Sequence, residues 1–285
     1  MTSVYGLADG TLLSTNDTGS VYKMVGGAPV WQETCDAPVT CGTPVKVSSW
    51  SVDARDHMNA RPADGQLVQA KSGSTDLPVS VTVGGALIPF ATPQEVVDAG
   101  YGPDWGAKVR GIPSRHFDLL PPIPQDGTLL QGSLGSTPVA AIVGGGRVNF
   151  ASPQEVVDAG FGSDWGAKVR AVPARAFSVL PTQIMDGTRL GKSGSTSEAA
   201  VVGGARVNFF SEEERNAAGY GNRPRQLIPA RVWDAMTTKI VDGTRIKSPA
   251  SPTVWLITQG QRTTTDVTTG AWTVPQRVVD SIPLS

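Results

Sequence analysis

Short runs of β-branched and other apolar residues, each interrupted by a pair of small residues, recur along the chain. They read "SVYKMVGGAPVW", "PVSVTVGGALIPF", "PVAAIVGGGRVNF", "SEAAVVGGARVNF" and "PTVWLITQGQRTT". Glycine adopts positive φ without a steric penalty, so Gly-Gly between two such runs predicts a β-hairpin. The fifth run has Gln259-Gly260 at this place and still supplies one glycine. The pattern therefore predicts five hairpins.

An Asp-Gly pair precedes every hairpin, and its spacing defines a repeat. The aspartates are 55, 62, 60 and 56 residues apart and are Asp9, Asp64, Asp126, Asp186 and Asp242. Residues 91–117 and 151–177 are identical at 20 of 27 positions, a match that indicates duplication. The repeats are accordingly assigned to residues 1–62, 63–124, 125–184, 185–240 and 241–285.

A short helix is predicted after the hairpin in the three middle repeats. In the third repeat, Ser152 fits the N-cap, Glu155 completes a capping box and Gly160 is the stop. The same signals recur as Thr92, Glu95 and Gly100, and as Ser211, Glu214 and Gly219. A helix of about two turns is not stable alone, so we expect each to dock on its own hairpin. Every middle repeat then closes with a short strand and a second helical turn, as in "VRAVPARAFSVLP".

The first and last repeats depart from this pattern. The first has "QETCDAPVTCGTPVKV" where the others have a helix, and we expect Cys35 and Cys41 to form a disulfide that closes this loop. The last has the Thr-rich "RTTTDVTTGAW" at the same place. Atypical end units are expected of a repeat array, because each end lacks one neighbour.

The fold class that follows is mainly β, with five tandem units of a β-hairpin plus a short helix. About sixty residues with three or four strands is the size of a β-propeller blade, which favours a five-bladed propeller-like ring. An open linear array is the alternative, and two sub-domains divided near residue 62 are a third arrangement. Helix content should lie well below the ~30–35% of an average globular chain.

Composition limits the classes of partner. The formal net charge is -1 and the pI is about 6.1, which gives no electrostatic reason to expect nucleic acid. No apolar run approaches the ~20 residues of a membrane-spanning helix. The N-terminal "MTSVYGLADG" has neither a basic nor an apolar segment, so no secretory signal is visible.

Catalytic, metal and cofactor signatures are weak. The chain has two histidines, His57 and His116, in different repeats, and the duplicate has Ala176 in place of His116. No nucleophile elbow, phosphate-binding loop or dinucleotide fingerprint occurs, and two cysteines without neighbouring histidines cannot complete a zinc site. Aspartate before glycine is more typical of a turn than of a calcium site. We therefore expect no enzyme, no metal and no cofactor.

Two equivalent loops are the candidate binding sites. Asp104-Trp105-Gly106 and Asp164-Trp165-Gly166 each place an indole beside a carboxylate. A sugar offers a CH face for the indole to cover and hydroxyls that donate to the carboxylate, so each loop is a candidate glycan subsite. The alternative is that both tryptophans pack between repeats. The fourth repeat has "GYGNRPRQL" and neither residue.

Recurring arginines have two interpretations. They are Arg110, Arg115, Arg170, Arg175, Arg206 and Arg231. We expect solvated positions or hydrogen bonds to carbonyl groups at the repeat junctions. Recognition of an anionic envelope polymer is the alternative.

Units of the form "DGTLL…V…VGG…F.SP..V…G…V..VP…LP" resemble tandem repeats of actinobacterial surface and cell-wall-associated proteins and of phages that infect actinobacteria. The resemblance covers nearly the whole chain, implies architecture and transfers no catalytic residue. We expect a non-catalytic attachment protein, a phage tail-associated or virion-surface component that recognises host cell-envelope carbohydrate. A virion protein released by lysis needs no signal and can oxidise its cysteines afterwards.

Two alternatives remain open: a bacterial surface or secreted lectin-like protein, and a purely structural virion or assembly module. The expected location is extracellular or on the virion surface. The expected partners are an envelope glycan or other virion or surface proteins, without nucleic acid or membrane insertion, and a homo-oligomer stays open.

Overall fold

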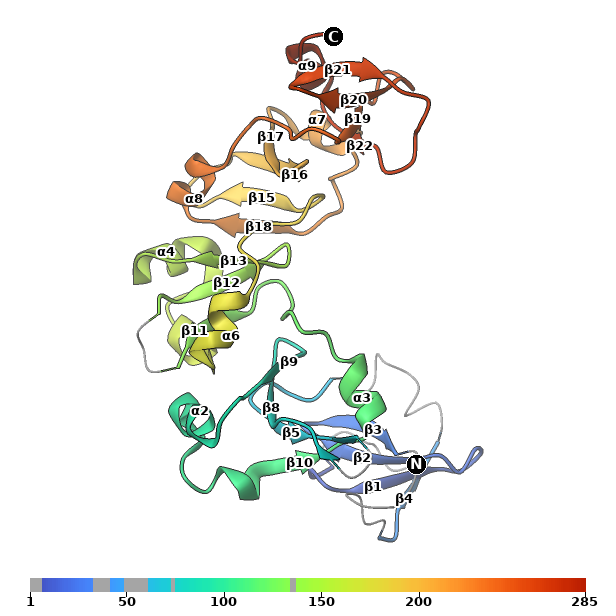
Figure 1. Cartoon of the computed structure of the whole chain (residues 1–285), viewed down its shortest axis with the longest axis vertical. Helices are drawn as coiled ribbons and strands as arrows, with labels where there is room; N and C mark the ends of the chain where they lie inside the picture. Colours follow the sequence, from blue (N-terminus) through green and yellow to red (C-terminus); the bar gives the residue numbers. More distant parts are fainter. Residues whose placement is uncertain (1–6, 33–41, 49–60, 73–74, 134–136) are drawn as a thin grey trace. The chain divides into compact units, whose positions relative to one another are not determined.

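The computed structural model describes residues 7–32, 42–48, 61–72, 75–133 and 137–285 (Figure 1). By their contacts the residues fall into two units, Met1–Val139 with Val169–Leu180 and Ala140–Lys168 with Pro181–Ser285. Cys35, Cys41 and His57 lie outside the described residues, and so does the expected disulfide.

The fold is mainly β, with five four-stranded sheets in tandem, each drawn from one sequence repeat (Figure 1). The first, in the order β3-β2-β1-β4, contains β1 (Leu12–Thr15), β2 (Val21–Val25), β3 (Ala28–Gln32) and β4 (Val45–Val47). The second, β10-β5-β8-β9, contains β5 (Leu67–Gln69), β8 (Ser80–Val83), β9 (Ala86–Pro89) and β10 (Val109–Gly111). A two-stranded ribbon, β6 (Lys71–Ser72) and β7 (Thr75–Asp76), accompanies it.

The other three sheets repeat this order. The third, β13-β12-β11-β14, contains β11 (Leu129–Gly132), β12 (Ala140–Val143), β13 (Gly146–Asn149) and β14 (Arg170–Val172). The fourth, β17-β16-β15-β18, contains β15 (Arg189–Lys192), β16 (Glu198–Val202), β17 (Ala205–Phe209) and β18 (Arg225–Ile228). The fifth, β21-β20-β19-β22, contains β19 (Arg245–Lys247), β20 (Val254–Thr258), β21 (Gln261–Thr264) and β22 (Trp272–Thr273).

All five sheets are mixed. The first three strands of a repeat are antiparallel, and the fourth pairs in parallel with the first, as in Leu13 with Val45 and Leu190 with Gln226. A propeller blade is instead an antiparallel sheet. Among the described residues no sheet is closed or joined to another, so the structure does not show the expected ring.

The five predicted hairpins are confirmed. Gly203 and Gly204 turn the fourth with φ of 53° and 67°, and Gln259 and Gly260 turn the fifth with φ of 52° and 73°. In four repeats the aspartate of the Asp-Gly pair stabilises the hairpin turn of its repeat. In the fourth repeat, Asp186 accepts hydrogen bonds from the Gly203 and Gly204 N–H groups at 2.8 and 2.9 Å. Asp9, Asp64 and Asp242 accept from the corresponding turns. These four aspartates therefore hold hairpin turns 17 to 20 residues further along the chain, whereas the sequence predicted hydrogen bonds to local backbone N–H groups.

The predicted helices begin where the capping residues stand. They are α2 (Pro93–Val96), α4 (Pro153–Val156) and α7 (Glu212–Ala217). The Thr92 side chain accepts from the Glu95 N–H at 3.2 Å, and Glu95 accepts from the N–H of Ala91 at 2.6 Å, one residue before the N-cap. Wide turns η1 (Val97–Tyr101) and η3 (Val157–Phe161) follow α2 and α4 and contain the stop glycines, Gly100 and Gly160.

Two further kinds of short helix complete the repeats. A one-turn helix follows the wide turn, as η2 (Trp105–Lys108) and α5 (Trp165–Lys168). A proline-capped helix follows the fourth strand and occurs as α3 (Ser114–Leu119), α6 (Ala174–Val179), α8 (Ala230–Ala235) and α9 (Gln276–Ser281). None of the described helices has the length and apolar character needed to cross a membrane.

An aromatic pair docks the helical segment on its hairpin in each middle repeat, as expected. The ring centroids are 6.2 Å apart for Phe90–Tyr101, 5.9 Å for Phe150–Phe161 and 5.4 Å for Phe209–Tyr220. The first two pairs meet edge to face, a favoured geometry for aromatic side chains. Burial raises the pKa of Tyr101 and of Tyr220 to about 12, so both phenols stay neutral.

An arginine of one repeat binds the capping glutamate of the repeat before it, a contact that we call the Arg–Glu clasp. Its three members are Arg175 with Glu95, Arg231 with Glu155 and Arg277 with Glu214, each with Nε 3.0 Å from Oε1. In each clasp the guanidinium also donates to a carbonyl oxygen at or beside the end of the hairpin, that of Pro89, Asn149 or Asn208. The second to fifth repeats are thus joined, each to the next, by one recurring polar contact.

Candidate functional site

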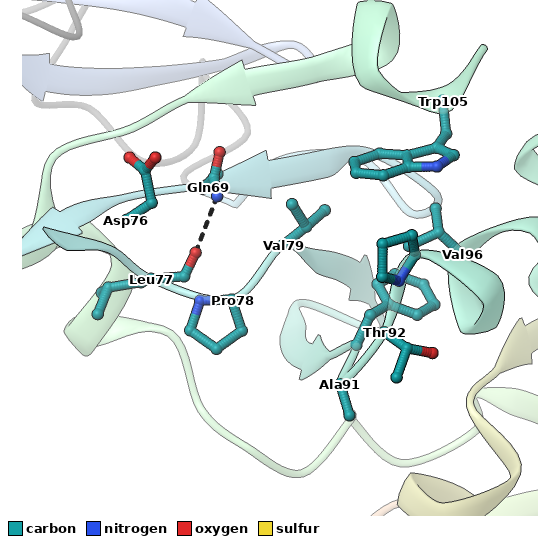
Figure 2. Close-up of a pocket in the computed structure, with 11 residues that line it drawn as sticks. Gln69, Asp76, Leu77, Pro78, Val79, Ala91, Thr92, Val96 and Trp105 are labelled. Carbon is teal, nitrogen blue, oxygen red and sulfur yellow. Dashed lines mark hydrogen bonds between the residues drawn. The ribbon is translucent and has the colours of Figure 1, made fainter. Parts of the chain in front are cut away.

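A pocket of about 310 Å³ in the second repeat contains Trp105, one of the two tryptophans singled out from the sequence. Figure 2 shows Trp105 and Val96 at one end, Asp76 and Leu77 at the other, and Val79 between them. The remaining lining residues are Gln69, Pro78, Phe90, Ala91, Thr92 and Pro93. An apolar wall with a few polar groups is the usual make-up of a small-molecule site.

Local structure places the indole at this wall. Gly100, with φ of 91°, and Gly102, with φ of 77°, reverse the chain after α2, and Trp105 then opens η2. The Trp105 side chain is half-buried, and it shares the lining with Pro93 and Val96 of α2. The indole of Trp105 therefore forms part of the apolar wall of the pocket.

Asp104 does not line the pocket. Its carboxylate lies 3.1 Å from Lys108 Nζ, four residues on, and Lys108 also donates to the Tyr101 carbonyl oxygen at 2.6 Å. The hydrogen bond from Lys108 holds the pKa of Asp104 below its ordinary value. The carboxylate expected to serve a ligand beside the indole is instead paired with a lysine on the exposed surface.

The acidic group of the pocket is Asp76, which the sequence did not single out. It is the one charged residue among the described residues that line the pocket. Two polar groups accompany it: Gln69, whose amide donates to the Leu77 carbonyl oxygen at 2.9 Å (Figure 2), and Thr92. The pocket thus pairs an apolar platform with one negative charge, one amide and one hydroxyl.

The third repeat carries part of this set, with Ser136 in place of Asp76. Counted from the hairpin glycines, Trp165 stands at the place of Trp105, and the amide of Gln131 donates to the Thr137 carbonyl oxygen at 2.9 Å, as Gln69 does to Leu77. Trp165 is half-buried and opens α5. Lys168 lies 2.8 Å from Asp164, and its hydrogen bond holds the pKa of Asp164 low. Asp164, like Asp104, is paired with lysine.

The fourth repeat has an ion-pair cluster at the positions that line the pocket in the second. Glu198 stands at the place of Val79, and Arg215 at the place of Val96. Glu198 lies 2.9 Å from Arg189, 3.1 Å from Arg215 and 3.3 Å from Arg225. Burial opposes the charge of Glu198, but hydrogen bonds from Arg189 and Arg215 outweigh it and lower its pKa. The apolar pocket with its indole is therefore not required by the repeat fold.

The recurring arginines make contacts within the protein. Arg175 and Arg231 form clasps, Arg206 donates to the Trp233 carbonyl oxygen, and Arg110 donates to that of Ala107. Arg170 lies 3.8 Å from Asp64. The side chain of Arg115 lies outside the described residues. These contacts agree with the expected hydrogen bonding at carbonyl groups.

His116 lies in α3, and burial holds its pKa below the ordinary value because the charged imidazolium is disfavoured there. Its Nε2 atom has no hydrogen-bond partner among the described residues. No group of three or more His, Cys, Asp or Glu side chains suited to a metal ion occurs in the described part of the chain.

No protein-family model and no curated protein matches the chain. Among solved structures, the chain aligns with one described as "Structure of the periplasmic assembly from the ESX-5 inner membrane complex, C1 model". The alignment covers 98% of this chain and 92% of that chain at 13% identity and a TM-score of 0.17. A TM-score this low carries no argument about the fold or the function of this chain.

Proposed function

We propose that the chain is a non-catalytic attachment protein and that its Trp105 pocket binds a sugar of a cell-envelope glycan. The observation that carries the proposal is the half-buried indole at the edge of an open apolar pocket that also contains Asp76. A pyranose ring has an apolar CH face that can lie on the indole. Its hydroxyls can donate to the Asp76 carboxylate and the Gln69 amide oxygen.

The polar groups of the pocket favour a ligand that carries hydroxyl groups. A wholly apolar ligand would remove Asp76, Gln69 and Thr92 from water without new hydrogen bonds, which is unfavourable. A polyhydroxylated ring can donate to these groups and still present its CH face to the indole.

The repeat architecture supports attachment. The second and third repeats present Trp105 and Trp165 in nearly identical sequence contexts, so a polymer of repeating sugars could engage both. Two weak sites on one chain raise the overall affinity when the ligand reaches both. A closed ring of repeats is no part of this proposal.

We further propose that the protein works at the surface of a phage particle, as a tail-associated or other virion component. The resemblance of the repeats to those of actinobacterial surface and phage proteins supports this location. Identification of the chain by mass spectrometry in purified particles would support it. Detection only on bacterial cells would favour a bacterial lectin-like protein.

A glycan array tests the binding proposal. The wild-type chain is compared with Trp105→Ala, Trp165→Ala and the double variant, and Trp255→Ala serves as a control because Trp255 packs under Arg262 in the fifth repeat. Loss of a central aromatic contact should weaken binding by about 1–3 kcal/mol, roughly 5- to 150-fold. Unchanged glycan binding in the double variant, or no glycan bound by the wild type, would contradict the proposal.

A further inference from the structure

Arg175 of the third repeat binds the chain on both sides of the segment that forms one wall of the Trp105 pocket. The wall segment is residues 90–93 of the second repeat. Arg175 Nη2 donates to the Pro89 carbonyl oxygen at 2.6 Å, just before the segment, and Arg175 Nε lies 3.0 Å from Glu95 Oε1, just after it. The guanidinium itself is not part of the lining.

Glu95 connects Arg175 to the wall directly. Its carboxylate accepts from the N–H of Ala91, a lining residue, at 2.6 Å, and its own N–H donates to Thr92 at 3.2 Å. One carboxylate therefore fixes the backbone at Ala91 while Arg175 fixes the carboxylate. The position of Pro93, which lies beside Trp105 in the lining, depends on the same short segment.

We propose that Arg175 is a positioning residue of the Trp105 pocket, so that docking of the third repeat shapes the binding site of the second. For its ligand the proposal rests on the proposed function, whereas for the shape of the pocket it rests on the contacts alone. Coupling of this kind is reciprocal, so a ligand in the pocket strengthens the contact between the two repeats.

The repeats provide a matched control. Arg277 of the fifth repeat makes the same clasp with Glu214 of the fourth and donates to the Asn208 carbonyl oxygen. The fourth repeat has no tryptophan at the place of Trp105. Removing Arg175 or Arg277 therefore breaks the same polar contacts, and the loss of Arg277 also removes its contact with the Phe210 ring, whose centroid lies 3.5 Å from Cζ. Only the loss of Arg175 should disturb the Trp105 pocket.

The first measurement needs no ligand. The protein is labelled with 5-fluorotryptophan, and the ¹⁹F resonance of Trp105 is assigned by its disappearance in Trp105→Phe. Arg175→Ala should shift or broaden this resonance at a temperature where every variant is folded, and Arg277→Ala should leave it in place. Arg175→Lys should restore it only in part, because an ammonium group cannot hold the Glu95 carboxylate and the Pro89 carbonyl in one planar fork. A Trp105 resonance unchanged in Arg175→Ala overturns the proposal.

The second measurement uses a purified actinobacterial cell-wall polysaccharide fraction as the probe. Arg175→Ala should weaken its binding about tenfold, while Arg277→Ala should bind as the wild type does. Equal affinity for all three proteins overturns the coupling. If the wild type does not bind this fraction or any array glycan, the proposed function fails, and the ¹⁹F comparison still decides whether Arg175 positions Trp105.

Discussion

Thr188 Oγ1 lies 2.1 Å from the position that a Cβ atom would take at Gly144. The corresponding distances are 2.2 Å from Thr128 to Gly84 and 2.3 Å from Thr244 to Gly203. The threonine that follows Asp-Gly in one repeat thus packs on the hairpin turn of the repeat before it. Gln259 takes the glycine position in the last hairpin, after which the chain has no further Asp-Gly-Thr unit.

Gly144→Ala should destabilise the protein by about 2–4 kcal/mol. The new methyl group overlaps Thr188, and φ at this position is 52°, a region that L-residues rarely adopt. Chemical denaturation with circular dichroism measures the loss. Gly127→Ala is the control, because its φ is also positive at 85° but nothing lies within 4 Å of the added Cβ atom. Equal losses of unfolding free energy in the two variants would show that the overlap with Thr188 adds nothing to the cost of Gly144→Ala.

Gln259→Gly should stabilise the protein by about 0.5–1.5 kcal/mol. Gln259 is the one residue other than glycine with positive φ in the described part of the chain, at 52°. The strain energy removed from the folded backbone exceeds the cost of the extra conformational entropy that glycine gives the unfolded chain. The midpoint of thermal unfolding of the last repeat should rise, and a fall would show that the Gln259 side chain makes a stabilising contact.

Trp105→Ala should lower the free energy of unfolding by much less than Trp233→Ala. Trp233 is buried, with 4% of its surface exposed, so its loss should cost about 3–5 kcal/mol. Trp105 is half-buried at the edge of an open pocket, and we expect a cost near 1 kcal/mol. Urea denaturation of both variants measures the difference. Similar costs would identify Trp105 as a core residue.

The stability of the second repeat should fall as the pH falls below about 6.5, and His116→Ala should reduce this dependence. Burial lowers the pKa of His116 in the folded protein from the ordinary 6.5, so the unfolded chain binds more protons in the interval below that value. The free energy of unfolding therefore keeps its full contribution from neutral His116 above about pH 6.5. It decreases as the pH falls from there toward the pKa of His116 in the folded protein.

Unfolding of wild type and His116→Ala at pH 7 and pH 5 tests this prediction. The variant should fold, since the third repeat has Ala176 buried at the equivalent position. An identical change in stability between the two pH values for both proteins would contradict the assignment to His116.

Local signals in the sequence accounted for the hairpins and the helix starts. Gly-Gly needs only its own backbone to turn, and Thr92 needs only the N–H of Glu95 three residues on. The parallel pairing of the fourth strand with the first was not predicted, because in the third repeat it joins Leu130 to Arg170 across forty positions. Without that pairing, the unit resembled an antiparallel blade in size and suggested a ring.

Of the two neighbouring residues that the sequence singled out in this repeat, Trp105 lines the pocket and Asp104 does not. Trp105 follows a glycine-marked turn, which the sequence shows. Asp104 was expected to serve a ligand, although Lys108 stands four residues on, a spacing that favours an ion pair on a short helix. Asp76 lies in the two-residue strand β7, and only the folded chain brings it to the same pocket as Trp105.

The Arg–Glu clasp has a consequence for how repeats can be gained or lost in evolution. Each middle repeat supplies a glutamate to its successor, and the third and fourth also supply an arginine to their predecessors. An in-frame copy of such a repeat therefore creates one new junction, for which one copy supplies the glutamate and the other the arginine, and needs no compensating substitution. Recombination between copies could lengthen or shorten the chain by whole repeats, and the near-identity of residues 91–117 and 151–177 is the mark that such an event would leave.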